Sequence, residues 1–173
     1  MLLLTGVWCA IKVSFQAIVF IFIEDKLMSR KKLAKILLSV LVVVSTLVSV
    51  VVDWNASHVF NPDWHPHGRF HDVMLLTLLV GFVPLLLWLL WRNSSEPEVA
   101  VKVTTAILVT FWGSFYINLL IPGTTPAANL EELPPSLLGI PLYPNMVVAA
   151  IIIILASIGN WLYHSGSTRE IQP

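Results

Sequence analysis

Long apolar segments alternate with short polar segments over the length of the chain. The four clearest apolar segments contain few charged residues and span residues 33–52, 73–91, 99–121 and 146–163. A helix of about 20 apolar residues crosses the hydrocarbon core of a bilayer and pairs its backbone polar groups within itself. The pattern therefore predicts an all-α fold, a polytopic transmembrane bundle of four core helices.

A fifth apolar segment, residues 2–23, precedes the four core segments. It is long enough to span a membrane, but Lys12 lies near its middle, where a charge costs about 2.5–3.5 kcal/mol. Met28 precedes a basic run and offers an alternative translation start. The N-terminal segment is therefore expected to be either an extra helix or a mis-assigned start. The expected divisions of the chain are this N-terminal segment (residues 1–27), a four-helix transmembrane domain (residues 28–164) and a cytoplasmic tail (residues 165–173).

The composition is typical of a protein that lies in lipid. Hydrophobic residues make up 57% of the chain, charged residues 12%, and the mean hydropathy is +0.83, whereas soluble domains are about a quarter charged. The formal net charge is zero, so no basic surface argues for a nucleic-acid partner. The single cysteine, Cys9, excludes an intramolecular disulfide. The predicted partner is the lipid bilayer, and the composition leaves the oligomeric state open.

Basic residues are distributed unequally between the two sides that four alternating helices create. One side holds only Arg69, and the other holds Lys26, Arg30, Lys31, Lys32, Lys35, Arg92, Lys102 and Arg169. Cytoplasmic segments of membrane proteins carry the excess of lysine and arginine. We therefore expect the four-helix core to begin in the cytoplasm and both long loops to lie on the non-cytoplasmic side. In a bacterium the membrane would be the plasma (inner) membrane.

Polar residues concentrate in one motif, Asp53 to Asp72, which contains four of the five histidines of the chain. Pro66 suits the first turn of a helix that continues into the second span. This helix would place His67 and His71 four residues apart on one face. The first span also carries a polar stripe that points into the bundle, at Ser45, Ser49 and Asp53. The motif is therefore expected to form a polar pocket at the non-cytoplasmic end of the bundle.

One interpretation of this pocket is a metal site. Imidazole and carboxylate groups are ligands of divalent transition metals such as zinc, iron and copper. The predicted metal ligands are His58, His67, His71 and Asp72. The identity of the metal is left open.

A second interpretation is acid–base catalysis on a lipophilic small molecule such as a sterol, terpenoid or quinone. Histidine is the side chain that most often transfers protons in enzymes, and carboxylates are its usual partners. A proton-driven isomerisation or cyclisation in a small helical bundle needs little more than these groups. The predicted catalytic residues are Asp53, His58, His67 and His71.

The alternative is a non-enzymatic membrane subunit or a lipid head-group binding protein. Arg69 and the free N–H groups of a helix start would bind an anionic head group. The same motif would also serve as a structural cap that sets the angle between two helices. The residues predicted to bind substrate or head group are Asn55, Asn61, Arg69, Tyr116 and Asn118.

The motif resembles one found in an uncharacterised family of small four-helix membrane proteins from fungi and bacteria. The shared pattern is D-W-N-x-x-H-x-x-N-P-x-W-x-P-H-x-x-F-H, and the resemblance extends over residues 28–164. Some fungal members are labelled acetyltransferases, but this chain has no glycine-rich cofactor loop and no soluble domain that would hold coenzyme A. The matching residues are Asp53, Trp54, Asn55, His58, Asn61, Pro62, Trp64, Pro66, His67, Phe70 and His71.

Overall fold

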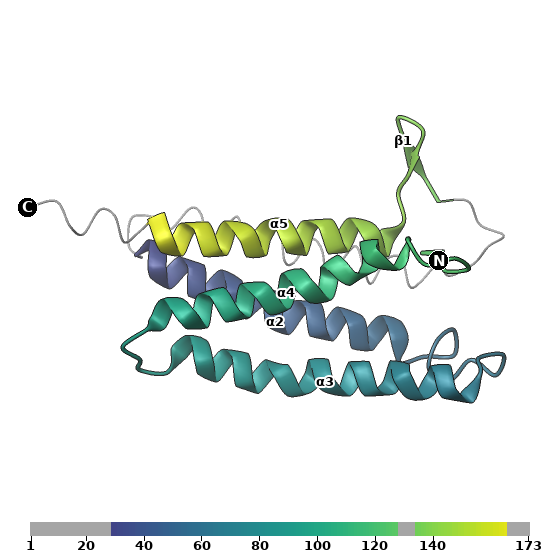
Figure 1. Ribbon diagram of the computed structural model, residues 1–173, viewed down its shortest axis with the longest axis horizontal. Helices are drawn as coiled ribbons and strands as arrows, with labels where there is room; N and C mark the ends of the chain where they lie inside the picture. The colour runs from purple at the N-terminus through teal and green to yellow at the C-terminus, as the bar shows by residue number, and fades with distance from the viewer. Residues whose placement is uncertain (1–28, 128–133, 166–173) are drawn as a thin grey trace, which may run out of the picture.

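The structure is a computed structural model that describes residues 29–127 and 134–165. Four helices dominate this part of the chain, and a two-stranded hairpin precedes the last of them (Figure 1). The prediction for residues 1–27 and most of the predicted cytoplasmic tail fall outside the described residues. The elements are α2 (Arg30–Asp53), α3 (Pro66–Trp91), α4 (Pro97–Asn118), β1 (Ser136–Leu137), β2 (Ile140–Pro141) and α5 (Pro144–Ser165).

All four described helices are long and apolar enough to cross a membrane. The predicted all-α bundle is thereby confirmed, and the chain is a multi-pass integral membrane protein. The mean hydropathy of the best window ranges from 1.4 in α4 to 2.7 in α3. Large apolar side chains are therefore exposed on the outside of the bundle, where lipid replaces the water that surrounds a soluble protein.

Local signals in the sequence set the starts of the helices. Ser29 caps α2, because its hydroxyl oxygen accepts a hydrogen bond from the backbone N–H of Lys32 at 3.3 Å. Pro66 and Pro97 occupy the first turns of α3 and α4, where a missing N–H costs no helical hydrogen bond. Pro84 lies inside α3 without ending it, as membrane helices allow.

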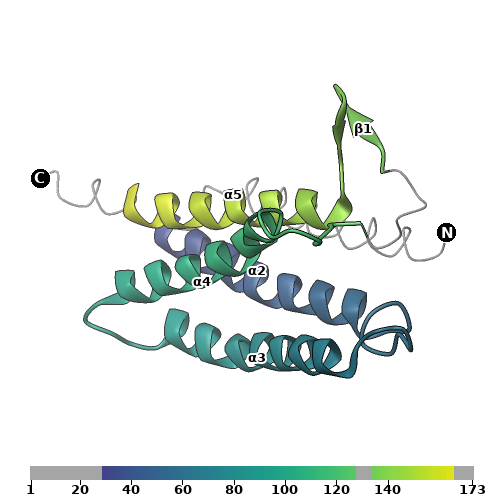
Figure 2. The same cartoon turned by 45° about the vertical axis from the view of Figure 1, so that its right-hand side comes forward.

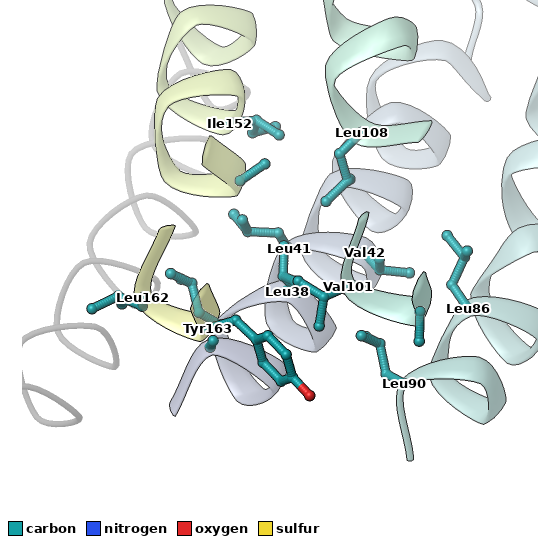
Figure 3. Close-up of a cluster of buried hydrophobic side chains, with 14 of the residues drawn as sticks. Leu38, Leu41, Val42, Leu86, Leu90, Val101, Leu108, Ile152, Leu162 and Tyr163 are labelled. Atoms are coloured by element: carbon teal, nitrogen blue, oxygen red, sulfur yellow. The ribbon is translucent and has the colours of Figure 1, made fainter. Parts of the chain in front are cut away.

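The helix α5 packs along both α2 and α4, whereas α3 packs mainly on α2 and only weakly on α4. Figures 1 and 2 show α3 at one edge of the bundle, opposite α5. Buried leucine, valine and isoleucine side chains from all four helices meet near the N-terminal half of α2 (Figure 3). The helices α2 and α5 pack closely at Gly159 of α5, where an added Cβ would lie 3.2 Å from Leu38 of α2.

The connection between α2 and α3 lies at one end of the bundle, together with the hairpin before α5. The short connection between α3 and α4 lies at the other end. In the hairpin, Ser136 pairs with Pro141 and Leu137 pairs with Ile140. The motif of residues 53–72 therefore occupies one end of the bundle, as predicted.

Candidate functional site

The loop between α2 and α3 folds back onto the end of α2. The carbonyl oxygen of Asp53 accepts hydrogen bonds from the backbone N–H groups of Asn55 at 2.9 Å and Val59 at 3.0 Å. The Val59 side chain is buried and anchors the loop by its apolar contact. These interactions hold His58 beside the last turn of α2.

The imidazole of His58 lies beside the carboxylate of Asp53 at the end of α2, and a second carboxylate, that of Asp72, lies near the start of α3. The Nε2 atom of His58 lies 3.8 Å from Oδ1 of Asp53, and both side chains are about a quarter exposed. Asp72 of α3 is close enough to interact electrostatically with both of them. One oxygen of the Asp72 carboxylate is buried and has no hydrogen-bond partner within the described residues. We call Asp53, His58 and Asp72 the proton site.

A chain of hydrogen bonds determines which nitrogen of His58 carries a proton. The amide of Asn55 has one orientation, because its Oδ1 accepts from the backbone N–H of Ser57 and its Nδ2 donates to the carbonyl of Val52. The hydroxyl of Ser57 must then donate its only proton to Oδ1 of Asn55, at 2.6 Å. Its oxygen is left to accept from Nδ1 of His58, at 2.8 Å.

This assignment leaves Nε2 of a neutral His58 without a proton, 3.8 Å from Oδ1 of Asp53. That separation allows an ion pair but is too long for a direct hydrogen bond. The cluster therefore places one oriented imidazole within ion-pair distance of a carboxylate, and Asp72 interacts electrostatically with both groups.

The predicted site residues His67 and His71 form a separate pair on α3. Their Nε2 atoms lie 3.0 Å apart, and their rings meet edge to face with centroids 4.5 Å apart. Both side chains are exposed. Within the part of the chain that the structure describes, no three histidine, cysteine or acidic side chains are placed to hold one metal ion. The predicted ligands His58, His67, His71 and Asp72 are therefore not brought together at one point.

Two of the predicted binding residues hold the loop in place. The guanidinium of Arg69 donates from Nη2 to the carbonyl of Asn61 at 2.6 Å, which ties α3 to the loop. The Asn61 side chain accepts from the backbone N–H of Asp63 and donates to the carbonyl of Ser57. Arg69 also has a buried Nε without a partner among the described residues. The structure thus engages both residues in loop contacts.

The predicted residues Tyr116 and Asn118 lie at the end of α4. The hydroxyl of Tyr116 donates to the carbonyl of Met146 at 2.7 Å and thereby joins α4 to α5. The carbonyl of Asn118 accepts from the hydroxyl of Thr124. Tyr116 therefore makes an interhelical hydrogen bond of a kind that is common in membrane proteins. Asn118 contacts the loop that follows α4.

Sequence reasoning missed two features of the site. The first is Ser57, which hydrogen-bonds to Nδ1 of His58 and so sets its tautomer. The only sequence signal for this role is the position of Ser57 between Asn55 and His58. The second feature is a small apolar cleft of about 20 Å³ between α2, α3 and α4. Its lining is mostly apolar, and the two hydroxyl side chains in it, Ser45 and Thr46, are on α2. The lining residues are Val42, Ser45, Thr46, Leu79, Phe82, Leu86, Ile107, Leu108, Phe111 and Trp112.

Comparison with known proteins places the chain in a family but assigns no activity. The model of a family of unknown function, DUF6640, matches residues 37–165, which include the whole motif from Asp53 to Asp72. No curated protein and no solved structure matches the chain. Because the match covers most of its length, the chain belongs to the family of unknown function DUF6640.

Proposed function

We propose that the protein is a membrane-embedded acid–base enzyme that transfers protons to and from a lipophilic small molecule. The observation that carries this proposal is the hydrogen-bond chain from Asn55 through Ser57 to His58. It places the proton of a neutral His58 on Nδ1 and leaves Nε2, which lies 3.8 Å from Asp53, free to exchange a proton. A histidine oriented on one nitrogen and paired with a carboxylate on the other is an arrangement suited to general acid–base catalysis.

The second carboxylate suits an isomerisation or cyclisation. Such a reaction delivers a proton to one carbon of the substrate and removes a proton from another, so no net proton is consumed. The pair of His58 and Asp53 would deliver the first proton, and Asp72 would accept the second. Asp72 has the free acceptor that this role requires, because one of its oxygens is buried without a hydrogen-bond partner among the described residues.

The lipid around the bundle supports a lipophilic substrate, because large apolar side chains are exposed on the described helices. The cleft of about 20 Å³ between α2, α3 and α4 is too small to hold a sterol, terpenoid or quinone. Such a compound would lie in the bilayer and bring its reacting part to the proton site at the end of α2. Ser45 and Ser49 are buried and form a polar stripe on α2 that leads to Asp53.

The distribution of charge supports a non-cytoplasmic location for the proton site. Arg30, Lys32 and Lys35 lie at the start of α2, and Arg92 follows α3, at the end of the bundle opposite the motif. The positive-inside rule places these residues in the cytoplasm. We therefore propose that the motif faces the non-cytoplasmic side.

Cysteine labelling tests this orientation. In a background in which Cys9 is replaced by serine, Ala56→Cys should react with a membrane-impermeant maleimide on intact cells. Ser95→Cys, in the connection between α3 and α4, should react only after the membrane is permeabilised. Both positions are exposed. The reverse pattern would contradict the proposed orientation.

Deuterium incorporation tests the proposed activity and does not require the substrate to be identified first. The purified protein would be reconstituted in vesicles that contain a total lipid extract and are suspended in heavy water. Proton transfer to carbon should leave deuterium in a lipophilic compound, which mass spectrometry detects. Vesicles without protein are the blank. If no compound gains deuterium above that blank with any host lipid extract, the proposal is wrong.

A further inference from the structure

The paired histidines on the outer side of α3 form a distinct feature that the proposed function does not use. His67 and His71 are separated by four residues in the first turns of α3 and lie on one face of the helix. Both are exposed, and their Nε2 atoms are 3.0 Å apart. The ring of Phe70 is nearly parallel to that of His67, with centroids 6.4 Å apart.

We propose that His67 and His71 form a two-ligand chelating site for a divalent transition metal ion, with copper(II) as the preferred ion. Imidazole nitrogens bind such ions at about 2.0–2.1 Å. Two exposed nitrogens 3.0 Å apart need only small side-chain rotations to bind one ion as neighbouring ligands. Copper(II) and nickel(II) form square-planar and tetragonal complexes with nitrogen ligands.

Copper(II) is preferred over zinc, because copper(II) has the highest affinity for nitrogen ligands among the first-row divalent ions. The partial positive charge at the start of α3 opposes every divalent cation to the same extent. It therefore lowers the affinity of the site without changing the order of the ions.

Binding changes the tautomer of one ring and needs no other reactant. In the metal-free pair, one Nε2–H donates to the other Nε2. In the complex both Nε2 atoms coordinate the ion, and both rings carry their proton on Nδ1. The proton of the donating ring moves from Nε2 to Nδ1, so the charge of the protein is unchanged. The remaining coordination positions are open to water and other small ligands.

Copper titration of the full chain, purified without a histidine tag, tests this site. Calorimetry should give one copper(II) ion per chain, bound at least tenfold more tightly than zinc. Electron paramagnetic resonance should show coordination by two nitrogen atoms. Because both side chains are exposed, His67→Ala and His71→Ala should each leave the helical circular dichroism unchanged and weaken copper binding at least tenfold.

A control variant keeps the number of histidines but changes their spacing. His67→Ala combined with Phe70→His leaves two histidines at adjacent positions, which do not share a helix face, and should bind copper as weakly as His67→Ala alone. The proposal is overturned if the control variant binds copper as tightly as the unmodified chain. It is also overturned if His67→Ala/His71→Ala leaves copper affinity unchanged, or if zinc binds as tightly as copper.

Discussion

Replacing Asp53 with asparagine is expected to lower the rate of deuterium incorporation by about 10²–10⁴-fold, the usual contribution of a general acid–base group. Asparagine has nearly the same shape as aspartate but accepts no proton from Nε2 of His58, which lies 3.8 Å away. The carbonyl of Asp53, which holds the loop through Asn55 and Val59, is unaffected by the substitution. We therefore expect the bundle to remain folded.

The matched control for this variant is Asp63→Asn. Asp63 is exposed and lies in the same loop, and its backbone N–H, which the substitution keeps, is bonded to Asn61. This variant should react at the rate of the unmodified chain. A normal rate in Asp53→Asn would contradict the assignment of Asp53. A loss of helical circular dichroism in Asp53→Asn would instead support the alternative in which the motif is a structural cap.

Replacing Gly159 with leucine is expected to destabilise the packing of α5 on α2 by about 3 kcal/mol, the upper part of the usual range for overpacking. A Cβ at this position already lies 3.2 Å from both Cγ and Cδ2 of Leu38, and 3.6 Å from Leu37. Both leucines are buried in the core, so they have little space into which to move. Small residues at such positions allow close helix packing in membranes, where burial of apolar surface from water contributes little.

Thermal unfolding in detergent, followed by near-ultraviolet circular dichroism, measures this effect. Gly81→Leu is the control, because Gly81 lies on the exposed side of α3 and an added Cβ would meet nothing within 4 Å. The control should unfold at the temperature of the unmodified chain, and Gly159→Leu should unfold at a clearly lower temperature. Equal temperatures for the two variants would contradict the close packing of α5 against α2.

The presence and approximate positions of the four described helices could be predicted from the sequence. A lipid environment requires each spanning segment to pair its own backbone, so length and apolar content alone identify the spans. The start of α3 at Pro66 was also predictable, because proline is suited to the first helical turn. The packing order was not predictable. All four spans are similarly apolar, and only the fit of residues such as Gly159 against Leu38 brings α5 beside α2.

The sequence by itself determined which residues form the motif and which end of the bundle they occupy. Only the tertiary structure decided which of them act together. His71 and Asp72 are neighbours in sequence, but successive residues of a helix point about 100° apart. Asp72 consequently interacts electrostatically with Asp53 and His58, whereas His71 pairs with His67 on the exposed side. The position of His58 depends on the fold of its loop around the carbonyl of Asp53, which no periodicity in the sequence encodes.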